Sequence, residues 1–174
     1  MKRFILVLCL LLGAPTQAAK FPSDAVVDGG YAYFGSIVVA QWTGARAAAA
    51  IWNPVGSGKV VYVDRIVLAH GNGSQNDGCD LRILTAAWGS LQGPGHNKRL
   101  ELGTGVAELR WGNLLASELP TPPYYECWMG PKLNDHTYDF TPALRLAPGY
   151  GLMVPSSSDN TIMVLSAQYR EYPQ

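Results

Sequence analysis

The segment Gly56-Ser57-Gly58-Lys59 resembles the end of a phosphate-binding loop, which would indicate nucleotide chemistry. That motif needs a glycine, four residues, and then Gly-Lys-Ser/Thr at the start of a helix. Asn53 stands at the first glycine position, and Val60 replaces the hydroxyl that would bind magnesium. β-branched residues follow, so no helix N-terminus would be directed at an anion. We interpret the segment as a turn between two strands.

Asp135, His136 and Asp139 lie close together in the stretch from Leu133 to Phe140, which we predict to be a loop. Carboxylate oxygens and an imidazole at this spacing are weak candidate ligands for a divalent cation. A single loop offers no second set of ligands. We therefore predict no metal and no cofactor.

Nucleophilic catalysis has no clear sequence pattern here. The only serine between two glycines is Ser57, in the predicted turn, and neither Cys79 nor Cys127 has a histidine at a diagnostic spacing. A pair of carboxylates for glycoside hydrolysis would meet in space and leaves no sequence pattern. We predict that the protein is not an enzyme.

Aromatic residues are the remaining candidates for binding, because exposed rings stack on sugars and anchor protein interfaces. Equally, such rings fill the core of a β-sandwich, so both interpretations stay open. The candidate binding residues are Trp88, Trp111, Tyr124, Tyr125 and Trp128.

Residues 1–18 are either a secretory signal peptide or a hydrophobic N-terminal arm that packs on another subunit. A basic start, an apolar run of about half the roughly 20 residues of a membrane-spanning helix, and small residues before Ala19 are typical of a signal peptide. We predict no permanent membrane span. Cleavage after Ala18 would remove two basic residues, leaving 11 against 13 acids and a formal charge of about −2.

Cys79 and Cys127 would then remain as an even pair in an oxidising compartment. A disulfide between them would close a loop of about 48 residues and stabilise the fold by roughly 3 to 4 kcal/mol. The alternative is two buried free thiols.

Composition indicates a single all-β domain over residues 19–174. The 174 residues include 19 Gly, 12 Pro, 9 Tyr and 5 Trp, and only 15% are charged. Turn formers and strand formers dominate. The 13 basic and 13 acidic residues balance, which argues against a nucleic-acid partner.

Strands are predicted at regular spacing. Lys59 to Ala69 has Val60, Tyr62, Ile66 and Leu68 on one face and Val61, Val63 and Val67 on the other, so both faces are apolar and it is either central or in contact with another subunit. The last strand alternates, with Met163, Leu165, Ala167 and Tyr169 toward a core. The other predicted elements are strands at Tyr31 to Gln41, Arg46 to Trp52, Asp80 to Ala86, Leu100 to Trp111, Glu126 to Met129 and on both sides of the turn in Leu144 to Val154, a long exposed loop at 88–99 and a short helical turn at Leu114 to Leu119.

Eight or nine short antiparallel strands favour a β-sandwich of jelly-roll type, with an up-and-down barrel as the alternative. Two segments, Trp52 to Ala69 and Leu144 to Pro173, are similar to small structural proteins of tailed bacteriophages. There an N-P-x-G-S-G turn leads into a strand, and an L-x-P-G-x-G-L turn precedes a final strand ending in a charged pair such as Arg-Glu.

The resemblance implies a decoration, tail or fibre-associated protein of the virion that self-associates, contacts other virion proteins and attaches to the host surface, with a host glycan as a further partner. The alternative is a secreted or periplasmic glycan-binding module. Localisation is then the virion or, after cleavage of the leader, the periplasm or exterior.

Overall fold

The computed structural model describes residues 29–40, 42–71, 78–98, 100–119, 125–128 and 136–174. The predicted leader, residues 1–18, lies outside them. The described residues form an all-β fold, as predicted, with two short 3-10 helices, η1 (Leu100–Leu102) and η2 (Ala116–Glu118). The strands are β1 (Ala32–Val39), β2 (Arg46–Asn53), β3 (Lys59–Gly71), β4 (Gly78–Leu84), β5 (Ser90–Asn97), β6 (Thr104–Leu114), β7 (Tyr125–Trp128), β8 (His136–Leu146), β9 (Tyr150–Asp159) and β10 (Ile162–Pro173).

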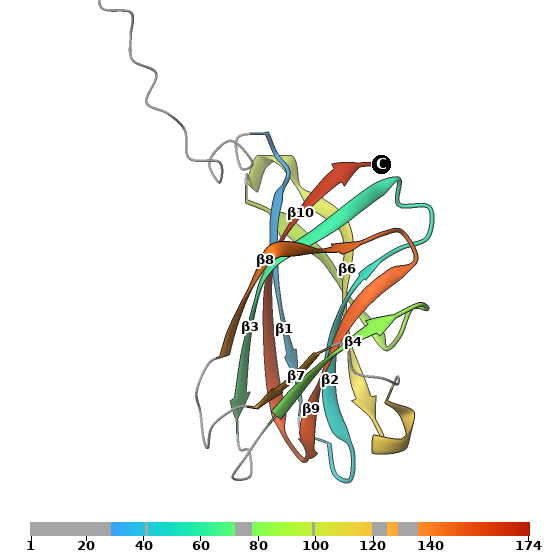
Figure 1. The fold of residues 1–174 in the computed structure, drawn as a ribbon, viewed down its shortest axis with the longest axis vertical. Coiled ribbons are helices and arrows are strands. Elements are labelled where there is room, and N and C mark those ends of the chain that lie inside the picture. Colours follow the sequence, from blue (N-terminus) through green and yellow to red (C-terminus); the bar gives the residue numbers. More distant parts are fainter. Residues whose placement is uncertain (1–28, 41, 72–77, 99, 120–124, 129–135) are drawn as a thin grey trace, which may run out of the picture.

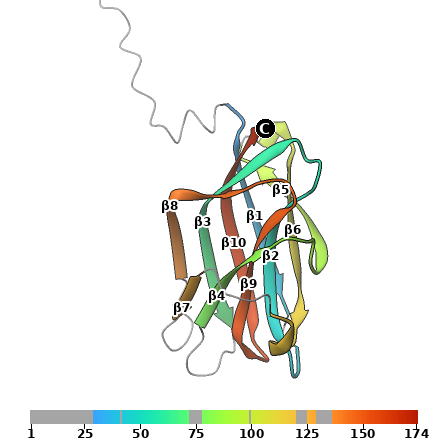
Figure 2. The ribbon, with the colours of Figure 1, turned by 45° about the vertical axis from the view of Figure 1, so that its right-hand side comes forward.

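The strands form one antiparallel sheet in the order β7-β4-β9-β2-β6-β5-β1-β10-β3-β8. The sheet curls, so that a layer of β1, β10, β3 and β8 faces a layer of β2, β9, β4 and β7, and the β5–β6 hairpin joins the two along one side (Figures 1 and 2). Strands next to each other in the chain, such as β1 and β2, lie in opposite layers. This crossing is the jelly-roll arrangement. An up-and-down barrel would pair consecutive strands throughout, so that alternative is wrong.

The main core lies between the two layers and takes side chains from both. It includes Ile37, Ile51, Val63, Leu152 and Leu165, each at most 1% exposed. β10 alternates as predicted, since Met163, Leu165, Ala167 and Tyr169 are all buried. β10, which has a regular two-residue period, therefore contributes one fully buried face to the core from the middle of its layer.

β3 does not keep the faces predicted for it. Its pairing with β10 shifts register between Val63 and Arg65, so Asp64 is an extra residue in a β-bulge against that strand, whereas on the other side β8 has the extra residues 140–143. The bulge reverses which residues point inward. Val61 and Val63 therefore lie on the core side together with Ile66 and Leu68. The predicted strict alternation therefore fails at the bulge, while Val67 and Ala69 keep the outer side of β3 partly apolar.

β2 is a strand, as predicted, although four consecutive alanines favour helix. Ala47 and Ala49 pack in the main core, while Ala48 and Ala50 belong to a second cluster on the other side of the strand. Small side chains fit a strand that is covered on both faces.

The predicted exposed loop at 88–99 contains β5, which accounts for a tenth strand. Gly95 explains how a glycine-rich segment joins the sheet. A Cβ atom there would lie 2.0 Å from the Tyr169 hydroxyl oxygen and 2.8 Å from the Phe34 carbonyl oxygen. The glycine permits a close approach of β5 to its neighbours, which propensity alone does not indicate. The helical turn predicted between Leu114 and Leu119 is confirmed as η2.

The Asn53–Lys59 segment is a turn, as predicted, and Asn53 fixes it. The Asn53 side-chain amide donates to the Lys59 and Leu146 carbonyl oxygens at 2.9 and 3.0 Å. Gly149 N–H donates to the Asn53 carbonyl oxygen at 2.8 Å. Gly56 and Gly58 have positive φ values of 78° and 66°, which glycine adopts readily. The two turns that carry the resemblance therefore contact each other.

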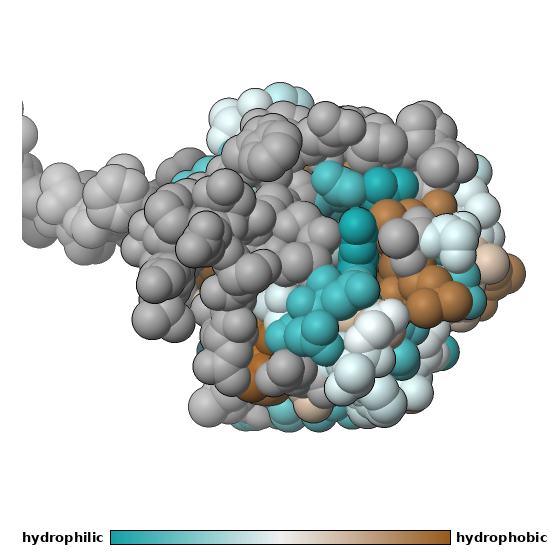
Figure 3. Space-filling view, turned by 90° about the horizontal axis from the view of Figure 1, so that it is seen from below, coloured by the Kyte–Doolittle hydropathy of each residue, from teal (hydrophilic) through white to brown (hydrophobic). Residues whose placement is uncertain are grey.

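Figure 3 shows the end of the molecule with the β1–β2 and β9–β10 connections, where hydrophilic side chains cross the middle and apolar ones gather at one side. Within the ranges given above, no helix is long and apolar enough to span a membrane.

Candidate functional site

The outer face of the β1–β10–β3–β8 layer, here called the open face, presents side chains to solvent in rows set by the strand register. The apolar row contains Val38, Val164 and Ala69, and its Val38 side chain is 65% exposed. The next row contains Ser36, Ser166, Val67 and Thr137, and the third contains Phe34, Gln168, Arg65 and Asp139. The open face thus changes from apolar to polar and charged along its strands.

The Asp64 bulge sets the chemistry at the far end of this face. Beyond it, Tyr62 is the register partner of Arg170, and Val60 that of Tyr172. The Asp64 carboxylate accepts from the Arg170 guanidinium at 2.9 Å from Nε and 2.7 Å from Nη2. Hydrogen bonding to Asp64 raises the pKa of Arg170, against a smaller effect of burial. Arg170 is therefore a fixed cation with a paired carboxylate beside it.

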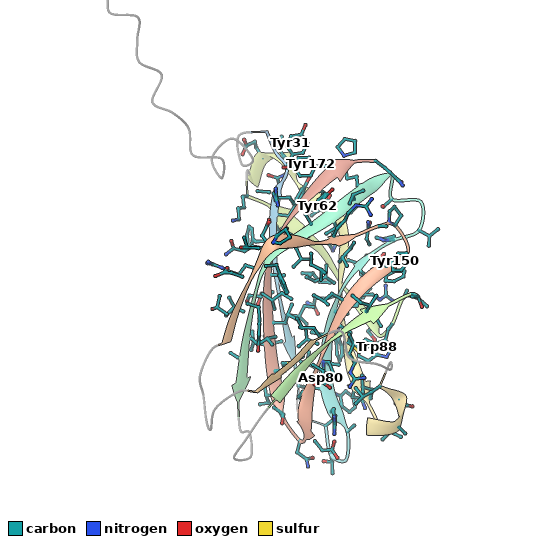
Figure 4. The ribbon with its side chains drawn as sticks, in the orientation of Figure 1. Tyr31, Tyr62, Asp80, Trp88, Tyr150 and Tyr172 are labelled. Atoms are coloured by element: carbon teal, nitrogen blue, oxygen red, sulfur yellow. The ribbon has the colours of Figure 1, made fainter. Side chains whose placement is uncertain are left out.

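Three tyrosines, Tyr31, Tyr62 and Tyr172, lie close together at this end of the open face (Figure 4). The rings of Tyr31 and Tyr172 are stacked with centroids 4.7 Å apart, and Tyr62 meets Tyr172 edge-on at 5.9 Å. The Arg170 guanidinium carbon lies 5.7 Å from the Tyr62 ring centre and 5.9 Å from that of Tyr172. Cation–π contacts of this kind orient the rings and the guanidinium together.

A cleft of about 240 Å³ opens at this cluster, and we call it the tyrosine cleft. Its lining combines apolar and aromatic surface with one charged side chain. The lining residues are Val60, Tyr62, Arg170, Tyr172 and Pro173.

A buried carboxylate anchors the β10 residues of the cleft from the core side. Glu171 is 1% exposed and accepts hydrogen bonds from Val106 N–H at 2.8 Å, Ala107 N–H at 2.9 Å and the Lys59 ammonium at 3.0 Å. A Cβ on Gly105 would lie 2.3 Å from Glu171 Oε1, so the site needs a glycine. The Arg170-Glu171 pair of the resemblance thus holds β10 to its surroundings from both faces.

Lys59 completes this anchor. Partial burial lowers the pKa of Lys59, but the hydrogen bond and charge of Glu171 outweigh that effect, so the pKa lies above its ordinary value. The ammonium is 5.7 Å from the Tyr33 ring centre.

Trp88 and Trp111 do not form an exposed binding surface. Both are partly buried and pack against the core clusters. The Trp88 ring lies over Gly112, where an added Cβ would be 3.0 Å from it. Arg110 donates from Nε to the Trp88 carbonyl oxygen at 2.8 Å and from Nη2 to that of Gly89 at 2.8 Å. For these two rings, the core interpretation is the one that the packing supports.

The remaining predicted aromatics lie at or beyond the limits of the described part. Tyr124 is outside it. Tyr125 and Trp128 begin and end β7, where their backbones pair with Leu81 and Gly78. Cys79 and Cys127 are direct backbone partners in the same pair of strands.

The weak metal candidates are not gathered in one loop. Asp135 lies outside the described residues, while β8 begins at His136, so the segment predicted as a loop is partly strand. Asp139 lies in that strand and its two carboxylate oxygens accept from Arg65 at 2.5 and 3.1 Å. Among the residues that the structure describes, no group of three potential ligands lies together.

No sequence pattern singled out Tyr31, Tyr62 or Tyr172 as binding residues. The alternation of β10 puts position 172 on the same face as Arg170, and this could have been read from the sequence. Tyr62 joins them only because of the bulge, which the sequence does not show.

No family model, curated protein or solved structure matches this chain.

Proposed function

We propose that this protein is a non-enzymatic assembly component that self-associates through the apolar end of the open face. In the phage structural proteins that the sequence resembles, this would be a subunit contact of the particle. The observation that carries the proposal is the exposed apolar row beside a row of small polar residues.

A second copy fits this face better than a highly charged partner. The apolar row and the serine row contain no charged side chain, and the Ser36 and Ser166 hydroxyls bond to each other at 2.9 Å, which satisfies part of their polarity. Sheets stack about 10 Å apart when their facing side chains are of moderate size. Exposed apolar patches on sheets often mark interfaces.

Val38→Glu tests this proposal, with Val55→Glu as the matched control. Both valines are exposed, at 65% and 81%, but Val55 lies in the β2–β3 turn, away from the open face. We expect the wild type to associate with increasing concentration in sedimentation equilibrium. Val38→Glu should weaken association about tenfold or more, because a charge would be removed from water at the contact, and Val55→Glu should not.

Two results would refute assembly through this face. One is a wild type that stays monomeric at high concentration and is absent from purified particles. The other is an equal loss of association in both variants.

A second candidate function, glycan binding, is favoured by the tyrosine cleft. Tyrosine rings pack against the apolar faces of sugar rings, and the Arg170–Asp64 pair supplies donors and acceptors without net charge. This arrangement suits a neutral saccharide. The aromatic residues that support it differ from the tryptophans selected in the sequence.

Tyr172→Ala should reduce retention on an oligosaccharide array, whereas Tyr150→Ala should leave it unchanged. Tyr150 is 46% exposed and lies at the start of β9, apart from the three clustered tyrosines (Figure 4). Failure of the wild type to bind any saccharide, or equal binding by Tyr172→Ala, would end this second candidate without affecting the first.

A further inference from the structure

The backbone register of β4 and β7 brings two cysteine positions together. Cys79 in β4 is the direct partner of Cys127 in β7, although the two positions are 48 apart in residue number. Directly opposed residues of an antiparallel pair lie on the same face of the sheet, with Cα atoms about 4.5 or 5.5 Å apart. Both separations fall within the range that a disulfide spans.

We propose that Cys79 and Cys127 form a cross-strand disulfide that fastens β7 to β4. The two thiols lose two protons and two electrons as the S–S bond forms. An oxidised dithiol or oxidised glutathione takes them up through a mixed disulfide and becomes two thiols. The bond adds a covalent link beside the backbone hydrogen bonds of the pair.

The position of β7 in the sheet indicates what the disulfide would stabilise. It is an edge strand of four residues, and β4 is its neighbour in the sheet. Edge strands this short have few hydrogen bonds to hold them, so they open easily. A disulfide in the middle of the strand would restrict that opening and keep the β2–β9–β4–β7 layer complete.

The proposal is independent of the assembly face, which lies on the other layer. It also connects with the leader, because an exported chain meets oxidants that form such bonds. Residues 1–18, whether cleaved or retained, contain the third cysteine, Cys9, which lies outside the paired strands.

Thiol labelling of the full chain tests the bond directly. The purified protein is equilibrated in a buffer of oxidised and reduced glutathione. It is then unfolded, and its free thiols are alkylated with iodoacetamide either before or after reduction. Peptide mapping keeps Cys9 separate. Before reduction we expect Cys79 and Cys127 unlabelled and their peptides linked to each other; after reduction both should be labelled. Independent labelling of both cysteines, or separate glutathione adducts on each, would overturn the proposal.

Serine variants give a second measurement. Reduction of the wild type should lower the midpoint of thermal unfolding by roughly 10 °C, on the entropy of a loop of this length. Cys79→Ser and Cys127→Ser should each show this loss without reductant, and the double variant should lose no more than either. Additive losses that reductant does not reproduce would indicate two separately packed thiols and refute the bond.

Discussion

The outer faces of the two layers contain different environments for similar residues. On the layer of β2 and β9, the chain covers its own sheet: Ala48, Ala50 and Met153 are fully buried, with Trp88 and Leu119 packed over their cluster. On the open face, Val38 and Phe34 stay 65% and 41% exposed. The first face belongs to the folding core of one chain. Apolar residues on the second contribute little to that core and remain free for association.

A glutamate introduced on either face should therefore lower the stability by very different amounts. Ala50→Glu would place an unpaired carboxylate in the second cluster and should lower the free energy of unfolding by about 4 kcal/mol or more. Val38→Glu, on the open face, should change it by no more than about 0.5 kcal/mol. Urea unfolding followed by tryptophan fluorescence measures both. Similar losses in the two variants would show that the open face is covered in the single chain.

The inner side of the open layer should be almost as sensitive as the covered face. Glu171→Ala would leave the buried N–H groups of Val106 and Ala107 without their acceptor, and we expect a loss of about 3 kcal/mol. Glu171→Gln keeps an acceptor oxygen and should lose clearly less. Urea unfolding of the two variants compares them. Equal losses would mean that the charge of Glu171, and not its acceptance of hydrogen bonds, matters.

Sequence patterns identified the fold well wherever one physical requirement determined a segment. β10 needs one buried face, so its alternation of Met163, Leu165 and Ala167 gave the correct orientation. Turns were also predictable, since Pro54 restricts the chain locally and the two glycines adopt the positive φ values that the turn requires. The strand assignment of β2 was correct because Pro54 ends the run of alanines too early for a stable helix.

The predictions were wrong where contacts with distant parts of the chain determine the local structure. The bulge at Asp64 is stabilised by Arg170, more than 100 residues away, and it reverses the inward side of β3. β5 joins the sheet because Gly95 fits against Tyr169 and the Phe34 carbonyl. For Trp88 and Trp111, the sequence left open whether the rings bind a partner or fill the core, for the same reason. The exposure of a ring depends on what the fold places over it, which the local sequence does not show.

Trp88 tests the difference between the two outer faces, because its ring packs over the outer face of the β2–β9 layer. Trp88→Ala should lower the free energy of unfolding by about 2 kcal/mol, less than for a fully buried tryptophan, because Trp88 keeps some exposure. Tyr150→Ala, at an exposed ring, should cost less than about 0.5 kcal/mol. Calorimetry of both variants checks this. A stable Trp88→Ala protein that loses retention on a saccharide array would instead make Trp88 a binding residue.

The smallest expected effect on stability is at Lys59, which lies between the buried Glu171 and the solvent. Its folded-state pKa lies above the ordinary value of 10.5, so the folded chain holds this proton more tightly than the unfolded chain. The resulting stabilisation is present below the unfolded pKa and is lost as pH rises through the folded one. Since Lys59 is only partly buried, we expect less than about 1 kcal/mol.

The difference in unfolding free energy between the wild type and Lys59→Met should therefore be larger at pH 9 than at pH 11.5. Lys59→Arg keeps its charge at both values and should retain its own difference from Lys59→Met. Urea titrations at the two pH values measure these differences. If the wild-type difference stays constant, the charge of Lys59 on Glu171 contributes nothing measurable to stability. The anchor of β10 would then rest on the backbone N–H groups of β6 alone.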